Sequence, residues 1–193
     1  MQSTAGWWII GIAAILALAL GKNRTTLAQE PRTEQPPTPA IPPAPIYAAG
    51  RLNASQRAAA DIIITAAQAA GVNPAFMVAL AVTESSLRPD ITGDDRKSIG
   101  LFQLQLATAR DYEPTITTGE LFDAAINARI AMRHLRMLQT RWPGGTAADY
   151  AQAWALGGAG YFRQRRRLPA KVSALDGAIA DLDLPITVNE VLT

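Results

Sequence analysis

The chain has 193 residues, enough for one domain of ordinary size plus appendages. Hydrophobic residues make up 49% of it and charged residues 18%, a composition typical of a folded, alanine-rich helical protein and not of a disordered one. Its 18 basic and 16 acidic residues leave a net charge of +2, too balanced to favour nucleic acid as the main partner. The absence of cysteine excludes a disulfide framework, a thiol nucleophile and a cysteine-ligated zinc site.

Residues 1–24 are predicted to be a membrane segment. No charged side chain precedes Lys22, and residues 7–20 (WWIIGIAAILALAL) form an unbroken apolar run. As a helix this run would extend about 21 Å, so small neighbouring residues must lengthen it to cross a bilayer. We expect a retained anchor with interfacial tryptophans. A signal peptide cleaved after Ala17 and Ala19 is one alternative, and an apolar helix buried in a partner is another.

Residues 25–50 are predicted to be a linker. The stretch 31–45 (PRTEQPPTPAIPPAP) contains seven of the thirteen prolines, and it can neither form enough backbone hydrogen bonds nor bury enough apolar surface to fold. As extended polyproline II it would span on the order of 45 Å. The linker would therefore hold a folded domain away from the membrane.

The pattern from residue 51 to 168 is helical, and no convincing strand alternation occurs in it. Ser55 can cap a first helix that runs to Ala70 and ends at Gly71. A second helix begins at Asn73 and Pro74 and continues to Thr83 or Glu84. Residues 75–82 of this helix have no charge on any face, so we expect it to lie at the centre of the fold.

Two further helices complete the predicted domain. Apolar residues recur at helical spacing over residues 121–142, after possible caps at Thr118 and Glu120. A fourth helix is expected over residues 147–156, before two glycines. The prediction is a compact, mostly α-helical domain over residues 51–168, with residues 169–193 as a C-terminal tail.

Glu84 is the candidate acid. It lies at the end of the uncharged second helix, where lost hydration and the negative end of the helix dipole both raise the pKa of a carboxyl group. A carboxyl that stays protonated near neutral pH can donate its proton to a leaving oxygen. Taken alone, a glutamate at a helix end is more often a side chain turned towards water.

The neighbouring motifs resemble the transglycosylase SLT domain of lytic transglycosylases, which is related to goose-type lysozyme. Residues 71–87 (GVNPAFMVALAVTESSL) match the family's proline-initiated helix that ends in a Glu-Ser pair, and residues 98–104 (SIGLFQL) match its Gly-Leu-Met-Gln motif. Weaker agreement continues through Leu121-Phe122-Asp123, Asn127 and Leu135. The resemblance covers roughly residues 55 to 165 and implies a lysozyme-like fold.

The resemblance implies roles for individual residues. Glu84 would act first as an acid and then as a base, and Ser85 would orient it or the substrate. Gln103 would contact sugar; Gly100 has the alternative role of a turn residue with positive φ, and Phe102, which replaces the family methionine, could equally pack the core. The resemblance implies neither a cofactor nor a metal, and no set of metal ligands is visible in the sequence.

A third family motif, Ala-Tyr-Asn-Ala-Gly, is altered in this chain. Residues 153–157 read AWALG, so Trp154 keeps an aromatic side chain on which a sugar ring could stack, while Ala155 replaces the asparagine. This replacement leaves open how the N-acetyl group of the substrate is held. Tyr161, shortly downstream, could supply the missing polar contact. His134, the only histidine, is interpreted as structural.

The implied activity is cleavage of the β-1,4 bond between N-acetylmuramic acid and N-acetylglucosamine in peptidoglycan, with formation of 1,6-anhydromuramic acid ends. A hydrolase of the lysozyme type, with Asp94 or Asp95 as the base that activates water, is the alternative enzyme. An inactive wall-binding or assembly protein is the alternative outside enzymes, and the loss of the asparagine at Ala155 favours it somewhat.

Peptidoglycan strands and a membrane, contacted through residues 7–20, are the expected partners. We expect the chain to be membrane-anchored, with its domain acting on the periplasmic wall. Lys22 and Arg24 conflict with that orientation, because positive charge favours the cytoplasmic side, unless the membrane belongs to a virus particle or a partner carries the domain across. The arginines at 163 and 165–167 could line a groove for anionic wall polymers or contact lipid headgroups; a solvated domain edge is the simpler interpretation.

Overall fold

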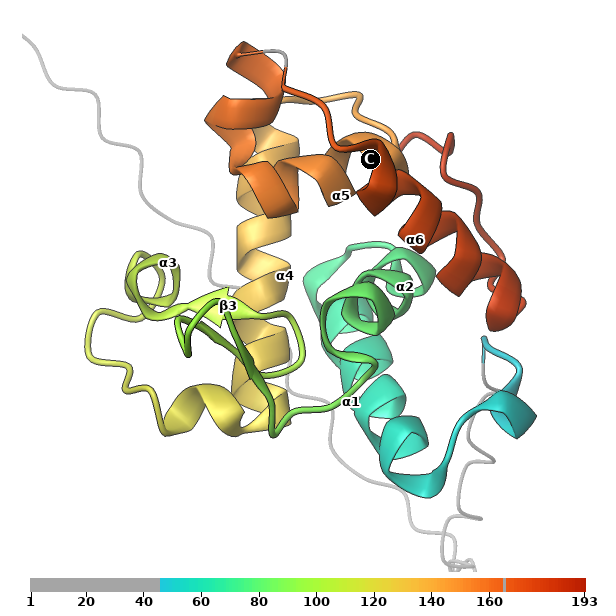
Figure 1. Cartoon of the computed structure of the whole chain (residues 1–193), viewed down its shortest axis with the longest axis horizontal. Helices are drawn as coiled ribbons and strands as arrows, with labels where there is room; N and C mark the ends of the chain where they lie inside the picture. Colours follow the sequence, from blue (N-terminus) through green and yellow to red (C-terminus); the bar gives the residue numbers. More distant parts are fainter. Residues whose placement is uncertain (1–45, 165) are drawn as a thin grey trace, which may run out of the picture. The chain divides into compact units, whose positions relative to one another are not determined.

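The computed structural model describes residues 46–164 and 166–193, and this part of the chain is mostly helical, as the sequence predicts (Figure 1). The longer helices are α1 (Ala54–Ala70), α2 (Pro74–Ser85), α4 (Ala124–Arg141), α5 (Ala147–Leu156) and α6 (Pro169–Asp181). The short elements are 3-10 turns at Ala49–Arg51 and Glu120–Phe122, α3 (Leu106–Arg110), a π-helical turn at Ala159–Arg163, and the strands β1 (Thr92–Gly93), β2 (Ser98–Ile99) and β3 (Leu104–Gln105).

Helix α1 is capped two residues earlier than the sequence predicts. Asn53, not Ser55, is the capping residue, because its side chain accepts from the backbone N–H of Gln56 while the Gln56 side chain accepts from Asn53 N–H. Gly71 ends the helix at a φ of 65°, a conformation that costs glycine little. The helix packs against both α2 and α4.

Helix α2 is the central helix, as its uncharged sequence predicts. Asn73 caps it through the backbone N–H of Phe76, and Pro74 fills the first turn. Residues 75–81 are buried on every side of the helix. Glu84 therefore lies at the end of a helix surrounded by protein, in its last turn before Ser85.

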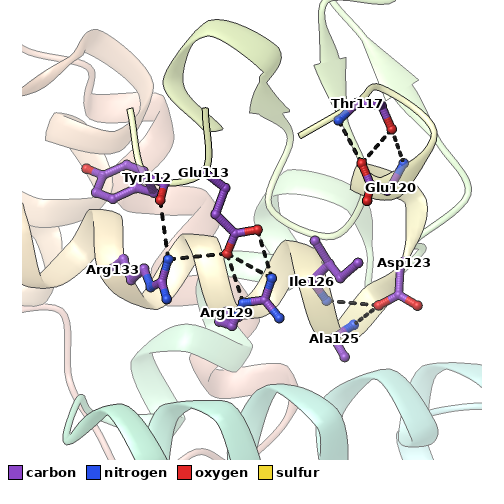
Figure 2. A network of polar contacts seen from close by, with 9 residues as sticks. All are labelled: Tyr112, Glu113, Thr117, Glu120, Asp123, Ala125, Ile126, Arg129 and Arg133. Atoms are coloured by element: carbon purple, nitrogen blue, oxygen red, sulfur yellow. Dashed lines mark hydrogen bonds and ion pairs between the residues drawn. The ribbon is translucent and has the colours of Figure 1, made fainter. Parts of the chain in front are cut away.

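Helix α4 begins later than the sequence suggests. Asp123 caps it by accepting from the backbone N–H groups of Ala125 and Ile126, both at 2.9 Å (Figure 2). Glu120, expected to lie at the helix start, belongs to the preceding 3-10 turn and binds the backbone and hydroxyl of Thr117. The carboxylate of Asp123 satisfies two first-turn donors, which fixes the start of the helix.

A small antiparallel sheet follows α2, in the order β1-β2-β3. Each strand has two residues, too few for the alternation by which strands are recognised in a sequence. The turn between β1 and β2 has three consecutive non-glycine residues with positive φ, Asp94, Asp95 and Arg96. The sheet brings this turn and the Gly-Leu-Phe-Gln segment to the same region of the fold.

Residues 169–193 are part of the folded domain instead of a tail. Helix α6 packs against α2 and α5 (Figure 1), and Leu175 on it is fully buried. Beyond it, Val191 forms a bridge with Thr146, and Leu192 is buried in the same core. Val172, Leu175, Ile179 and Leu182 recur at helical spacing, so the sequence does carry a signal for this helix, which the predicted boundary at residue 168 leaves out.

The predicted anchor (residues 1–24) and most of the predicted linker (residues 25–50) lie outside the described residues. Within residues 46–164 and 166–193, no helix is both long and apolar enough to span a bilayer.

Candidate active site

A cleft of about 530 Å³ lies between the end of α2, the sheet and the helices α4 and α5. It contains three of the side chains singled out in the sequence, Glu84, Gln103 and Trp154. Its lining residues also bring together three segments of the chain that lie far apart in the sequence. The further lining residues are Gly93, Asp94, Ser98, Leu104, Gln105, Thr108, His134, Ala155, Leu156 and Gly157.

Glu84 is nearly buried, with 14% of its side chain exposed, and Lys171 of α6 is its ion-pair partner. The Lys171 Nζ atom lies 2.7 Å from Glu84 Oε1 and 2.9 Å from the Thr83 hydroxyl. Burial raises the pKa of Glu84 above the ordinary carboxyl value; Lys171 opposes this effect, and the negative charge of Asp94 adds to it. The net result is a carboxyl that holds its proton to higher pH than an exposed glutamate.

Ser85 is buried and serves the fold. Its hydroxyl lies 2.8 Å from the Leu101 carbonyl and 3.1 Å from the Ala81 carbonyl, and it accepts from the backbone N–H of Arg88 at 3.3 Å. The Ser85 side chain therefore connects the end of α2 to the Gly-Leu-Phe-Gln segment, away from the cleft lining.

The backbone on both sides of Gly100 is held by Asn127, a fully buried residue of α4. The Asn127 amide donates to the carbonyls of Ile99 and Leu121 at 3.0 and 2.8 Å and accepts from the Phe102 N–H at 3.0 Å. A Cβ on Gly100, whose φ is 72°, would lie 2.6 Å from both the Asn127 amide and the Leu121 carbonyl. Glycine at this position thus allows close packing in a left-handed conformation.

Gln103 reaches the cleft with a φ of 47°. Its side-chain Nε2 donates to the Gly100 carbonyl at 2.9 Å and to the Ile91 carbonyl at 3.4 Å. These bonds fix the amide against the sheet, and a Cβ on Gly93 would lie 2.5 Å from the Gln103 Oε1 atom. The side chain is therefore held in one orientation before any ligand binds.

Trp154 and His134 form an aromatic wall of the cleft. The indole N–H of Trp154 donates to the Phe102 carbonyl at 3.2 Å, and its ring meets the His134 ring edge-on with centroids 4.9 Å apart. The hydroxyl of Tyr112 lies 2.9 Å from His134 Nδ1. Burial lowers the pKa of His134, and Asp111 opposes this effect, so the ring is neutral at physiological pH.

The segment that carries Tyr112 is attached to α4 by charged side chains (Figure 2). Arg129 binds both carboxylate oxygens of Glu113 at 2.8 Å, and Arg133 binds Glu113 at 3.2 Å and the Tyr112 carbonyl at 3.4 Å. Both arginines lie on α4, as does His134. These contacts of Arg129 and Arg133 therefore keep the Tyr112 hydroxyl within hydrogen-bond distance of His134.

Tyr161 lies away from this cleft. Its ring is buried, its hydroxyl donates to Asp149, and the Arg167 guanidinium lies 4.7 Å from the ring centroid. Burial and the Asp149 carboxylate raise the pKa of Tyr161 to about 12. The turn after Gly157 directs Tyr161 into a second hollow, which Arg141 and Trp142 also line.

The sequence assigns no site role to Lys171, the ion-pair partner of Glu84, or to His134, which lines the cleft. Lys171 lies 87 residues beyond Glu84, in a segment with no motif, and His134 has no signal apart from its residue type. Both candidate bases are exposed, but Asp94 lines the cleft and accepts from the Ser98 hydroxyl at 2.9 Å, whereas Asp95 is not part of the cleft lining. Residues 46–164 and 166–193 contain no cluster of ligands suited to a metal ion.

The arrangement provides a buried proton donor beside a fixed amide and an aromatic wall. Such a set suits protonation of a leaving oxygen in a sugar chain, since burial raises the pKa of the acid and the aromatic face can hold a ring. The family model described as "Transglycosylase SLT domain" matches residues 61–169, more than half of the chain. Comparison with curated proteins gave no significant match. The match to the family model, together with the geometry of the cleft, shows that this chain belongs to the transglycosylase SLT family.

Proposed function

We propose that the chain is a lytic transglycosylase that cleaves the bond between N-acetylmuramic acid and N-acetylglucosamine in peptidoglycan. The observation that carries the proposal is the nearly buried Glu84, which faces the cleft beside Gln103 and Trp154. Membership of the SLT family supports peptidoglycan as the substrate. Trp154 offers a ring on which a sugar can stack, and Gln103 offers an amide oxygen for its hydroxyl groups.

In the proposed reaction, Glu84 protonates the glycosidic oxygen as the bond to the anomeric carbon of N-acetylmuramic acid breaks. The acetamido group of the same sugar stabilises the positive charge that develops at this carbon. Glu84, now a carboxylate, takes the proton of the C6 hydroxyl, and the C6 oxygen closes the 1,6-anhydro ring. One carboxyl group thus serves both steps, and no water is consumed.

A lysozyme-like hydrolase is the second candidate, because Asp94 also lines the cleft. In that reaction Asp94 would activate a water molecule that attacks the anomeric carbon, and the product would be a reducing sugar. The hydrogen bond from Ser98 holds the Asp94 carboxylate in place. We favour the transglycosylase because the segments around Glu84 match the family motifs, whereas no motif surrounds Asp94.

The products formed in heavy-oxygen water distinguish the two candidates. The full chain is incubated with purified peptidoglycan, and the fragments are separated and analysed by mass spectrometry. We expect 1,6-anhydromuramic acid ends without label. One labelled oxygen per cut would replace the proposal with the hydrolase, and the absence of any cut would leave an inactive wall-binding protein.

We also propose that residues 7–20 anchor the enzyme in a membrane, so that the proline-rich segment carries the domain to the wall. The support is the charge-free apolar run in the sequence. The full chain should stay with membranes through an alkaline carbonate wash. A mature protein whose first residue is Leu20 or Gln29 would instead indicate signal cleavage. The same arrangement suits a bacterium that remodels its wall and a virus that opens one.

A further inference from the structure

Lys171 and Glu84 form an ion pair that is almost closed to solvent. Only 11% of the Lys171 side chain and 14% of the Glu84 side chain are exposed. The ammonium group also binds the Thr83 hydroxyl at 2.9 Å. Two hydrogen bonds and low exposure distinguish this pair from surface ion pairs, which are screened by water and contribute little.

The position of Lys171 is fixed by the packing of α6. Lys171 lies in the first turn of this helix, where its backbone N–H donates to the Leu168 carbonyl at 3.0 Å. The Leu168 N–H in turn donates to the Gln152 side chain of α5 at 2.9 Å. Further along, Leu175 is fully buried. The lysine is therefore held at the acid by the fold of the C-terminal segment.

Other ionisable groups lie in the cleft and on neighbouring helices, and each of them differs from Lys171 in its charge or in its bonding partner. Asp94, from the turn between β1 and β2, adds negative charge, and His134 of α4 lines the same cleft and is neutral. On α1, Arg57 binds the Leu52 carbonyl and Asp61 accepts from Tyr47.

On α5, Asp149 accepts from Thr146 and Tyr161. Among residues 46–164 and 166–193, Lys171 is thus the positive charge in direct contact with the acid.

A positive charge in contact with a carboxyl group has two effects on an acid catalyst. It stabilises the carboxylate, which favours proton donation to the leaving group, and it lowers the pH at which the carboxyl loses its proton in the free enzyme. On the basis of the proposed function, we propose that Lys171 is a positioning residue, which holds the Glu84 carboxyl in the cleft and sets the upper pH limit of peptidoglycan cleavage.

The test compares the pH dependence of cleavage in the full chain and its variants. Lys171→Met keeps the length and apolar stem of the side chain but removes its charge. The alkaline limb of the rate profile should move up by about one pH unit or more, the usual effect of losing an opposite charge at this distance. Lys171→Arg, which retains the charge, should keep the limb close to that of the wild type.

A second readout follows the carboxyl group itself. The carbon-13 signal of the Glu84 carboxyl, assigned through its loss in Glu84→Gln, is titrated in the wild type and in Lys171→Met. We expect its midpoint to move upward by the same amount as the rate profile. Asp176→Asn changes a charge at an exposed position of the same helix and should move neither quantity.

The two readouts separate failure of this inference from failure of the proposed function. If the wild type releases no fragments, the proposed function fails, and the carbon-13 titration still decides the role of Lys171. An unchanged Glu84 midpoint in Lys171→Met would overturn the inference. If thermal unfolding shows that Lys171→Met does not fold, Lys171→Gln replaces it with the same expected direction.

Discussion

The Ser85 hydroxyl donates a hydrogen bond of 2.8 Å to the carbonyl of Leu101, sixteen residues further along the chain. This bond connects the residue next to the candidate acid with the segment that carries Gln103. The two most specific motifs in the sequence, Glu-Ser and Gly-Leu-Phe-Gln, are therefore joined by a buried hydrogen bond. In this structure the Ser85 side chain fixes the end of α2 against the backbone of the Gly-Leu-Phe-Gln segment, and so helps to place the cleft residues Glu84 and Gln103.

Ser85→Ala should destabilise the domain by about 1–3 kcal/mol, because it leaves the buried Leu101 carbonyl without this donor. Urea unfolding followed by circular dichroism measures the change. Ser55→Ala, at an exposed position of α1, is the control and should change the free energy of unfolding by less than about 0.5 kcal/mol. Equal effects of the two substitutions would contradict the role given to Ser85.

Asn127→Leu should lower the free energy of unfolding by about 3 kcal/mol or more. The substitution leaves two buried carbonyls and one N–H group without their partner, and each such group costs about 1–3 kcal/mol. Gln139→Leu on the same helix is the matched control, because the Gln139 Nε2 atom is buried without a hydrogen-bond partner among the described residues. This control should be neutral or stabilising in the same urea titration. A stable Asn127→Leu would show that the amide does not hold the motif segment.

Trp154→Ala should reduce the rate of peptidoglycan cleavage about tenfold or more, equivalent to about 1.4 kcal/mol. The substitution removes both the aromatic face in the cleft and the hydrogen bond to the Phe102 carbonyl. Trp154→Phe keeps a ring while losing that bond, so it should retain an intermediate rate. If Trp154→Phe were as slow as Trp154→Ala, the hydrogen bond and not the ring would explain the effect.

Asp94→Asn should retain most cleavage activity but lose it at lower pH than the wild type does. The Asp94 carboxylate raises the pKa of Glu84, so its removal lowers that pKa. A general acid works in its protonated form, so the alkaline limb of the rate profile moves down. Asp95→Asn, in the same turn but outside the cleft lining, is the control and should leave the profile unchanged. Complete loss of activity in Asp94→Asn would favour the hydrolase.

The sequence predicts the helices of this domain well where local signals are strong. The uncharged run of residues 75–82 and the caps at Asn73 and Pro74 define α2, and two glycines define the end of α5. The predicted cap of the first helix, Ser55, is wrong because Ser55 and Asn53 are both good capping residues, and the side chain of Gln56 selects Asn53. Strands of two residues have no period to detect.

The site is predictable only in part, because sequence motifs identify residues with local signals but not contacts that depend on tertiary packing. Glu84, Gln103 and Trp154 were found through motifs and meet in the cleft. Lys171 was not found, since its contact with Glu84 depends on the tertiary packing of α6 and has no local signal. Tyr161 lies close to Trp154 in the sequence. The turn after Gly157 nevertheless places its side chain outside the cleft, where its hydroxyl donates to Asp149.

The most direct test of the account is the release of soluble fragments from purified peptidoglycan by the full chain and by Glu84→Gln. Glutamine keeps an oxygen that can accept from Lys171 but cannot donate the catalytic proton. We predict that the wild type releases fragments ending in 1,6-anhydromuramic acid, and that Glu84→Gln releases none while keeping the helical circular dichroism of the wild type. A folded Glu84→Gln that still cleaves peptidoglycan would contradict the assignment of Glu84 as the acid.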